Sequence, residues 1–537
     1  IYLDNYFQES TPGGPRSEAT NHAINNKVDK GALLINYTGH GSPLGWTSER
    51  ILELDQINAW DNENKLPLFM TATCKFSYFD NPAETSAGEY VLLNPNGGAI
   101  ALLSTTRLVY SAPNYNLNTK FIKTLFEKVG GEFPRLGDVF KQTKVLSGTS
   151  PNNRNFTLLG DPALCLAYPE YKVQTTNIVD TLKALDKVTI EGRVIDDYGL
   201  LEPIESARNS RTGILDSFNG TVYITVYDKE IIRNTLGQES CTPMPYRNQN
   251  NILYKGAATV TDGEFSFSFI VPKDIAYNYG AGKISYYAVS NDDDPVDAGG
   301  SDAGFVIGGT ADDIVYDYEG PELELFINTR NFLDGGLTDK NPVLLADVMD
   351  FSGINTVGNG IGHDITAVLD GNTANPYVLN DFYEAKKDDY TKGVISFPFY
   401  DLEKGEHTLT LKVWDVFNNS SEATITFVVA DENEFTISDY ITYPNPFSNS
   451  TDIYFQHNKA DQNLDVVLEI YSITGTLVKR QEESYSDNGY RIGPIPWNGK
   501  DEYGGQLSAG MYIAKLGVSS SDGDFTSKSI RIILLPQ

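Results

Sequence analysis

The pattern of apolar residues changes near residue 168, and this change constrains the fold more than any other feature of the chain. Before it, short apolar runs such as GALLINY, LPLFMTATC and GGAIALLST alternate with helical stretches such as NTKFIKTLFEKV. Buried runs of this length between helices are typical of parallel strands in an α/β sheet. After it come short strands of alternating polarity, such as KVTIEGRVI and GEFSFSFIV, separated by turns. That second pattern indicates β-sandwiches.

The chain has 537 residues, enough for three or four domains. We predict a multidomain protein in which an α/β domain over residues 1–168 precedes three all-β, immunoglobulin-like sandwich domains. These are expected over residues 169–315, 316–430 and 431–537. The acidic, glycine-rich stretch NDDDPVDAGGSDAG, with GGTADD after it, is predicted to be a long loop and then a linker.

Composition argues against several classes of function. The formal net charge is −31, from 72 acidic and 41 basic residues, whereas nucleic-acid binding needs clustered Lys and Arg. No apolar run reaches the roughly 18 residues that a transmembrane helix requires. The stretch NDDDPVDAGGSDAG has enough oxygen atoms to bind Ca²⁺, but it lacks the ordered spacing of an EF-hand loop. We therefore expect no cofactor and no nucleic-acid partner.

The ends and the cysteines of the chain add two expectations. The sequence begins IYLDNYFQES, without an initiator Met or a signal peptide, so we expect a fragment or a processed product whose preceding residues are missing. Only three cysteines occur, Cys74, Cys165 and Cys241. A chain of this size therefore has no disulfide framework.

A histidine and a cysteine follow two neighbouring apolar runs in the α/β part. His40 lies between two glycines in LLINYTGHGS, and Cys74 ends LFMTATC, which is 74 − 40 = 34 residues later. Because ligands bind at the carboxyl ends of strands in open α/β sheets, both side chains are expected at the same edge. A thiolate is a nucleophile, and a nearby imidazole accepts its proton. The pair predicts a cysteine nucleophile with a histidine base.

The amides of Gly41 and of Cys74 itself are the predicted donors to a tetrahedral oxyanion. The structural alternative is that Cys74 is a buried apolar residue at the end of a strand, as free cysteines often are. From the residues alone, both interpretations remain open. No H-E-x-x-H, C-x-x-C or phosphate-loop motif supports metal-dependent or nucleotide-driven chemistry.

The remaining cysteines and histidines are weaker candidates. Cys165 lies in the apolar run PALCLAY and is expected in the core, and Cys241 lies in a loop without a nearby histidine in sequence. The other histidines occur singly and are expected at the surface or in loops, since nothing in their sequence surroundings marks them as ligands. They are His22, His363, His407 and His457.

The segments YTGHGS with Trp46, TATC, PNGGAIALLSTTR and NFTLLGDPAL resemble the caspase-like cysteine peptidases, and among them the gingipain family. The resemblance covers about residues 1–168. It implies that His40 and Cys74 form the catalytic dyad and that the amides of Gly41 and Cys74 form the oxyanion hole. Family members carry further strands and acidic pocket residues before the histidine, which this sequence does not include.

The last hundred residues, about 436–537, resemble the sorting domain of type IX secretion cargo through YPNPF, ITGTLVKR and LSAGMYIAKL. An ordinary immunoglobulin-like module would have the same strand pattern. Together with the gingipain-like part, this order of domains is most similar to that of the type IX secretion sortase. That resemblance implies a peripheral protein on the extracellular face of the outer membrane, docked through residues 436–537 on a β-barrel shuttle protein.

On this interpretation the enzyme removes the sorting domain from cargo proteins and attaches the cargo to anionic lipopolysaccharide. One alternative is a secreted gingipain-like endopeptidase that is itself cargo of the same system and cleaves after a basic residue. A peptidase cargo usually loses its terminal domain on maturation, whereas this sequence includes it. A third alternative is a non-catalytic surface scaffold, against which the presence of both His40 and Cys74 argues.

Overall fold

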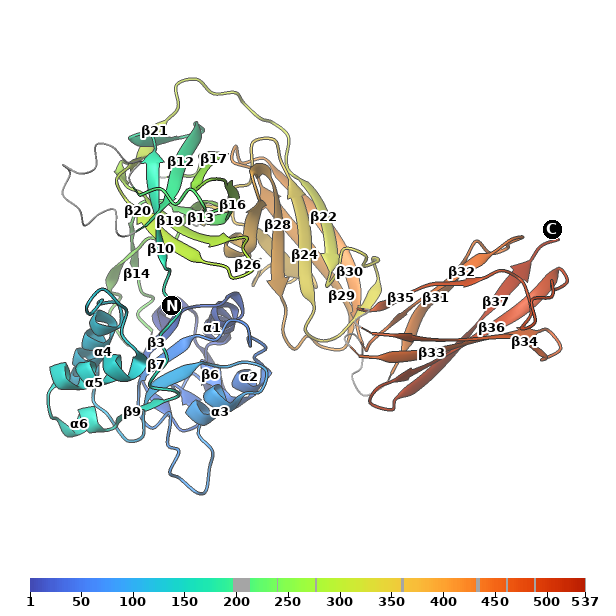
Figure 1. Ribbon diagram of the computed structural model, residues 1–537, viewed down its shortest axis with the longest axis horizontal. Coiled ribbons are helices and arrows are strands. Elements are labelled where there is room, and N and C mark those ends of the chain that lie inside the picture. Colours follow the sequence, from blue (N-terminus) through green and yellow to red (C-terminus); the bar gives the residue numbers. More distant parts are fainter. Residues whose placement is uncertain are drawn as a thin grey trace. The chain divides into compact units, whose positions relative to one another are not determined.

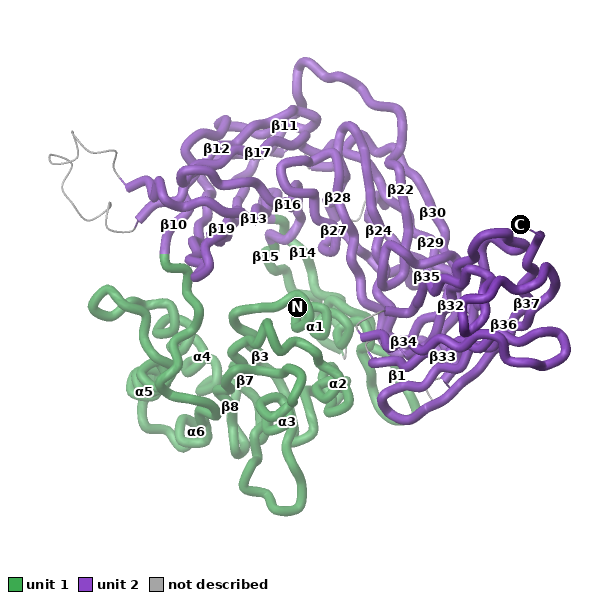
Figure 2. The backbone as a smooth tube through the Cα atoms, turned by 45° about the vertical axis from the view of Figure 1, so that its right-hand side comes forward, with its two compact units in different colours: residues 1–170, 231–248 green, residues 171–230, 249–537 purple. Residues whose placement is uncertain are grey.

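The computed structural model describes residues 1–196, 213–238, 240–275, 278–358, 362–430, 435–459, 462–486 and 489–536. The chain divides into two compact units (Figure 2). Unit 1 comprises residues 1–170 and 231–248, and unit 2 comprises residues 171–230 and 249–537. Among the described residues, no helix combines the length and the apolar character needed to cross a bilayer.

Unit 1 is built around one four-stranded sheet in the order β3-β7-β8-β9. The first three strands are parallel and β9 is antiparallel to β8. The sheet strands are β3 (Leu34–Thr38), β7 (Leu68–Ala72), β8 (Ala101–Thr105) and β9 (Phe156–Leu159). Every residue of β7 and of β8 is buried, which is why these strands appear in the sequence as continuous apolar runs.

Helices cover both faces of this sheet (Figure 1). The core on the Phe69 side is closed by α1, α2 and α3, and the core on the Met70 side by α4 and α5. The helices are α1 (Glu18–Lys30), α2 (Leu54–Ala59), α3 (Ala87–Leu93), α4 (Ser111–Leu125), α5 (Leu136–Ser147) and α6 (Pro151–Arg154). Short strands complete the unit: β1 (Glu9–Thr11), β2 (Gly14–Arg16), β4 (Gly41–Ser42), β5 (Gly45–Trp46) and β6 (Leu52–Glu53).

A hairpin from the middle of the chain, β14 (Ile231–Asn234) with β15 (Pro245–Asn248), also belongs to unit 1. Asp4 accepts hydrogen bonds from the amides of Gly237 and Gln238, at 2.8 and 2.9 Å. Leu236 donates its amide to the carbonyl of Asp4 at 2.7 Å. Sequence analysis placed this hairpin within the domain over residues 169–315, because pairing between segments so distant in sequence leaves no local pattern.

Unit 2 is all-β and begins with a seven-stranded sheet, in the order β16-β13-β19-β20-β10-β12-β17, beside a three-stranded sheet, β11-β21-β18. Its edge strands β16 and β17 are joined by a tight turn, so the seven-stranded sheet curls. The strands are β10 (Tyr171–Asn177), β11 (Thr181–Ala184), β12 (Lys187–Ile195), β13 (Gly220–Tyr227), β16 (Ile252–Val260), β17 (Glu264–Ile270), β18 (Gly280–Ala281), β19 (Lys283–Ser290), β20 (Asp297–Asp302) and β21 (Val306–Thr310).

The next sandwich faces a four-stranded sheet, β22-β24-β28-β27, with a five-stranded one, β23-β30-β29-β25-β26. Its strands are β22 (Glu322–Ile327), β23 (Gly336–Thr338), β24 (Val343–Met349), β25 (Thr366–Leu369), β26 (Tyr377–Val378), β27 (Tyr383–Lys386), β28 (Asp389–Pro398), β29 (Gly405–Trp414) and β30 (Ser420–Val429). One continuous hydrophobic core runs from Val173 to Val429 and is shared by both of these β regions.

The last sandwich has a core of its own. It joins a three-stranded sheet, β31-β32-β35, with a four-stranded sheet, β34-β33-β36-β37. The strands are β31 (Ile437–Tyr443), β32 (Thr451–His457), β33 (Leu464–Ser472), β34 (Leu477–Tyr485), β35 (Arg491–Trp497), β36 (Gly510–Ser520) and β37 (Phe525–Leu534). The predicted architecture, an α/β core followed by β-sandwiches, is confirmed.

Part of the acidic stretch expected as a loop and linker forms strands instead. Residues 297–302 form β20, which pairs with β19 on one side and β10 on the other. Its small residues allow this close packing: Ala298 is fully buried, and a Cβ at Gly300 would lie 2.1 Å from the carbonyl oxygen of Val173. Glycine and aspartate content therefore predicted the wrong structure here, because these small side chains make room for a neighbouring backbone.

Candidate active site

His40 and Cys74 lie at the same edge of the unit 1 sheet. Strands β3 and β7 are parallel, with Thr38 opposite Ala72. His40 follows Thr38 by two residues and Cys74 follows Ala72 by two residues. The register offset of the strands, 72 − 38 = 34, thus equals the separation of the pair in sequence. Since neighbouring strands lie ~4.8 Å apart, the two backbones leave the sheet level with each other.

The two loops that carry the pair touch through Gly41 and Thr73. A Cβ added to Gly41 would lie 2.5 Å from Oγ1 of Thr73, so only glycine fits at this point. Thr73 is fully buried, and its carbonyl oxygen accepts a hydrogen bond from the hydroxyl of Thr105 on β8. The approach of the histidine loop to the cysteine loop is therefore fixed by close packing.

The turn at His40 is held by its own backbone carbonyl. Tyr37 donates its hydroxyl to the His40 carbonyl oxygen at 2.6 Å, and the Thr47 amide donates to the same atom at 3.0 Å. The Tyr37 ring stacks on Trp46, with centroids 4.0 Å apart and planes at 7°. Burial raises the pKa of Tyr37 well above its ordinary value, so the phenol stays protonated and remains a donor. The His40 residue itself is exposed.

Cys74 is half-buried at the start of a turn that follows β7. Its Sγ lies 3.5 Å from the carbonyl oxygen of Val109, to which the thiol donates. The next residue, Lys75, has a φ of 55°, which turns the chain away from the strand direction, and its amide donates to the carbonyl of Arg107 at 3.2 Å. The loop after β8 thus supports the thiol from one side.

The two amides predicted to form an oxyanion hole belong to Gly41 and Cys74. The Thr47 amide bonds the His40 carbonyl, and bonded and non-bonded positions alternate in an antiparallel ladder. Gly41, opposite Trp46, is therefore a non-bonded position whose N–H points away from β5. Within the described part of the chain, the N–H of Cys74 donates no hydrogen bond to backbone or side chain. Among the described residues neither amide has an acceptor, and their role as an oxyanion hole stays a prediction.

Asparagines from outside the sheet fix its carboxyl edge. Asn114 donates to the carbonyl of Ala72 at 3.2 Å, and Asn118, one turn later on α4, donates to the hydroxyl of Thr38 at 2.9 Å. Asn152 in turn bonds Asn114 at 3.1 Å. Sequence reasoning missed these supports. The signal was available in NYNLN, where two asparagines four residues apart lie on one face of a predicted helix.

Exposed apolar side chains lie on the loops that follow His40 and Cys74 and on the loop that carries Val109. Leu44 in the β4–β5 turn, Phe79 after the cysteine, and Leu108 and Tyr110 on either side of Val109 are all exposed. The carboxylate of Asp80 is held by the guanidinium of Arg107, with contacts of 2.9 and 2.6 Å. A substrate segment beside the thiol would meet apolar side chains, and Asp80 and Arg107 neutralise each other.

The other candidates do not join this site. Cys165 is exposed in an irregular segment, which corrects the expectation that it lies in the core, because the apolar run around it ends in loop backbone. Cys241 is exposed in the β14–β15 loop, as expected. His407 and His457 were expected at the surface or in loops and are instead buried on strands. His407 is retained inside by hydrogen bonds to Asp370 and to the carbonyl of Glu403.

The two remaining histidines are partly buried. His22 lies on α1, and burial lowers its pKa. His363 lies 2.6 Å from the carboxylate of the buried Asp274 in unit 2. Neither is on the cysteine loop or its neighbours in the unit 1 sheet.

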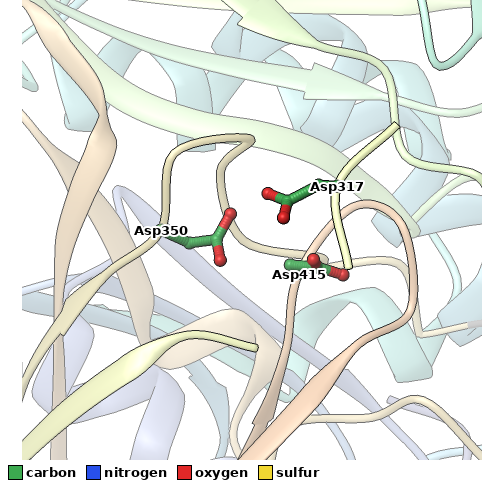
Figure 3. A group of neighbouring side chains, drawn as sticks. All are labelled: Asp317, Asp350 and Asp415. Carbon is green, nitrogen blue, oxygen red and sulfur yellow. The ribbon is translucent and has the colours of Figure 1, made fainter. Parts of the chain in front are cut away.

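Three aspartates of unit 2 form a separate acidic cluster (Figure 3). Carboxylate oxygens of Asp317, Asp350 and Asp415 lie within 4.8 Å of one another. Burial raises the pKa of Asp415 to about 6 and also raises that of Asp350. Asp415 already accepts amide hydrogen bonds from Phe417 and Asn419, at 2.9 and 2.7 Å. These donors close the β29–β30 turn, so we interpret the cluster as loop structure and assign no metal to it.

Comparison with known proteins shows which family the α/β part matches. Residues 1–167 match the model of peptidase family C25. These residues are thus similar to that family, the gingipain family. The match covers His40, Cys74 and the loops around them, so the resemblance stated from the sequence is confirmed. None of the curated proteins matches the chain.

Several solved structures are similar to this chain. Dimeric latent PorU from Porphyromonas gingivalis has 29% identity and a TM-score of 0.31, over 94% of this chain and 46% of that one. The RgpB pro- and mature domains from the same organism have 18% identity and a TM-score of 0.26, over 52% and 57%. Fibronectin(III)-like modules of Clostridium thermocellum CbhA have 10% identity and a TM-score of 0.16, over 40% and 95%. This chain spans less than half of the PorU chain.

Proposed function

We propose that this protein is a cysteine peptidase in which Cys74 is the nucleophile and His40 the general base. The proposal rests on the register of β3 and β7, which brings the two residues to adjacent positions at one sheet edge. His40 takes the thiol proton, and the sulfur attacks the scissile carbonyl carbon. The amides of Gly41 and Cys74 bind the resulting oxyanion. The protonated imidazole then gives its proton to the leaving amine, and a thioester remains on Cys74.

The fate of the thioester defines the more specific proposal, a sortase of type IX secretion. Attack by an amine transfers the acyl group, whereas attack by water completes hydrolysis. The substrates would be cargo proteins bearing carboxyl-terminal sorting domains, and the acceptor an amine of anionic lipopolysaccharide at the extracellular face of the outer membrane. The resemblance of residues 436–537 to a sorting domain supports docking on an outer-membrane β-barrel shuttle protein.

The side chains on the loops beside Cys74 suit an apolar substrate segment, as the sortase proposal requires. A pocket for Lys or Arg needs an unpaired carboxylate, because burying a cation without a partner is costly. Asp80 lies close to Cys74 in sequence, but its carboxylate already forms an ion pair with Arg107. Exposed Leu44, Phe79 and Leu108 instead suit an apolar segment of the substrate.

The deciding experiment compares the full chain with Cys74→Ala and with Cys165→Ala as the matched control. Each is incubated with a purified cargo protein that carries a sorting domain, together with a small primary amine, and the products are read by intact mass. Loss of the sorting domain with amine on the new carboxyl terminus, absent only in Cys74→Ala, supports the sortase. Cysteine-dependent cleavage with water alone supports the endopeptidase. Equal results for wild type and Cys74→Ala overturn the peptidase proposal and favour the scaffold.

A further inference from the structure

Two tyrosines form an exposed aromatic pair on the outer face of the seven-stranded sheet. Tyr223 on β13 and Tyr287 on β19 are directly opposite each other. Their rings are stacked, with centroids 6.5 Å apart and planes at 25°, and each residue is 45% exposed. Inward-pointing neighbours on both strands are buried, so the tyrosines belong to the outer face.

The residues beside the pair leave the ring surfaces open. Ala257 on β16 lies opposite Tyr223, and Gly299 on β20 lies opposite Tyr287. The hydroxyl of Tyr287 donates to the carboxylate of Asp297 at 3.1 Å, which orients its ring. Cross-strand aromatic pairs stabilise a sheet by themselves, so the pair alone would be unremarkable as a structural contact.

The pair also lines a cavity, which a purely structural contact does not require. The cavity holds about 160 Å³, and its side-chain lining is Tyr223, Thr225, Lys255, Ser285, Tyr287 and Glu384. Thr225 and Ser285 are opposite each other on β13 and β19, directly beside the tyrosines. A cavity of roughly 150 Å³ accommodates one six-membered ring. The hollow is thus sized for a single ring, with aromatic and hydroxyl-bearing side chains around it.

The polar groups around the cavity select a neutral, hydroxyl-rich ligand. Hydroxyls of Thr225 and Ser285 both donate and accept hydrogen bonds, while Lys255 only donates and an ionised Glu384 only accepts. Lys255 and Glu384 lie 3.4 Å apart and neutralise each other, so neither a phosphate nor a cation finds an uncompensated partner.

We propose that this cavity is a binding subsite for one pyranose ring of a neutral glycan. The apolar C–H face of the sugar packs against the Tyr223 and Tyr287 rings. Its hydroxyls exchange hydrogen bonds with the hydroxyls of Thr225 and Ser285 and with the Lys255–Glu384 pair. The site lies wholly within unit 2 and does not depend on the peptidase chemistry proposed for His40 and Cys74.

Saturation-transfer NMR on the full chain tests this subsite, with methyl pyranosides of glucose, galactose, mannose and N-acetylglucosamine at about 10 mM as probes. We expect transfer to the ring C–H protons of at least one probe. The double variant Tyr223→Ala/Tyr287→Ala should weaken it about tenfold. Tyr503→Ala, which removes a tyrosine that is 97% exposed in another domain, should leave it unchanged.

A second variant separates lost binding from lost folding. Tyr223→Phe/Tyr287→Phe keeps both rings and should retain most of the transfer signal, because stacking needs the ring faces. Absence of transfer to every probe, or equal transfer in the double alanine variant, overturns the proposal. Displacement of the sugar signal by inorganic phosphate would also overturn it, since the Lys255–Glu384 pair should reject an anion.

Discussion

Gly41 and Thr73 lie so close that a Cβ on the glycine would meet the threonine hydroxyl at 2.5 Å. This contact joins the loop of His40 to the loop of Cys74. The spacing of the proposed dyad therefore depends on the steric fit between Gly41 and the Thr73 side chain. This contact can be altered by mutation without changing His40 or Cys74.

Gly41→Ala should lower kcat/KM for cargo cleavage by about 10²-fold, because displacements near 1 Å cost that much in a positioned reaction. Thr73→Ala introduced beside it removes the atoms that the new methyl group meets and should restore part of the activity. Steady-state kinetics on the wild type, both single variants and the double variant measure this. Full activity of Gly41→Ala would show that the contact does not position the dyad.

Tyr37→Phe should lower kcat/KM by about fivefold while leaving the fold intact. The variant removes the hydrogen bond to the His40 carbonyl, a contact worth about 1 kcal/mol, but keeps the ring stacked on Trp46. Near-ultraviolet circular dichroism provides the control, because the signal of the stacked rings should persist. An unchanged rate would mean that the Thr47 amide holds the turn without help.

The order in which the three thiols react should depend on the reagent. Cys165 and Cys241 are exposed and Cys74 is half-buried, so a small neutral alkylating reagent should modify the first two faster. A peptide inhibitor with a thiol-directed warhead should modify Cys74 selectively, because it uses the histidine and the peptide-binding surface. Peptide mapping by mass spectrometry reads both patterns. Equal labelling of the three cysteines by the inhibitor would favour the non-catalytic scaffold.

The last sandwich should lose stability as the pH falls from 6.5 towards 4. Burial lowers the pKa of His457 to about 4, and its Nε2 has no hydrogen-bond partner within the described residues. The unfolded chain therefore binds a proton that the folded chain excludes, which costs about 3 kcal/mol over this window. Hydrogen exchange of β31 and β32 in the full chain should accelerate at acid pH. His457→Leu should abolish the acceleration if the imidazole is its cause.

Asp4→Ala should release the β14–β15 hairpin. Backbone hydrogen bonds from Gln238 first, and then from Gly237, lower the pKa of Asp4 to about 2. The ionised carboxylate stabilises the contact between Asp4 and the hairpin above pH 3.8, and this contribution is lost as the pH falls through 2. Limited proteolysis of residues 235–244 should be faster in Asp4→Ala and unchanged in the control Glu9→Ala. Equal cleavage would mean that the other contacts between residues 1–170 and the hairpin hold it in place without the Asp4 carboxylate.

The sequence predicted those elements whose buried residues form a regular pattern along a short stretch of the chain. Strand β12 has the bounds of the run KVTIEGRVI, from which a strand was predicted. The strand ends that carry His40 and Cys74 were predicted from their apolar runs. What the sequence did not reveal depends on partners distant in the chain. Gly300 packs on Val173, and Asn114 bonds Ala72, contacts that no window of neighbouring residues records.

The equal offset of 34 residues between strand partners and between His40 and Cys74 also bears on how such a site can evolve. Alignment of the pair is set by strand pairing, so the crossover between Gly41 and Leu68 need not keep a fixed length. Insertions there would lengthen a surface excursion and leave the pair level. A slip of one residue in the pairing, by contrast, would misplace one partner along the sheet edge without removing any reactive atom. Selection that maintains this site therefore acts on the register in which β3 and β7 pair.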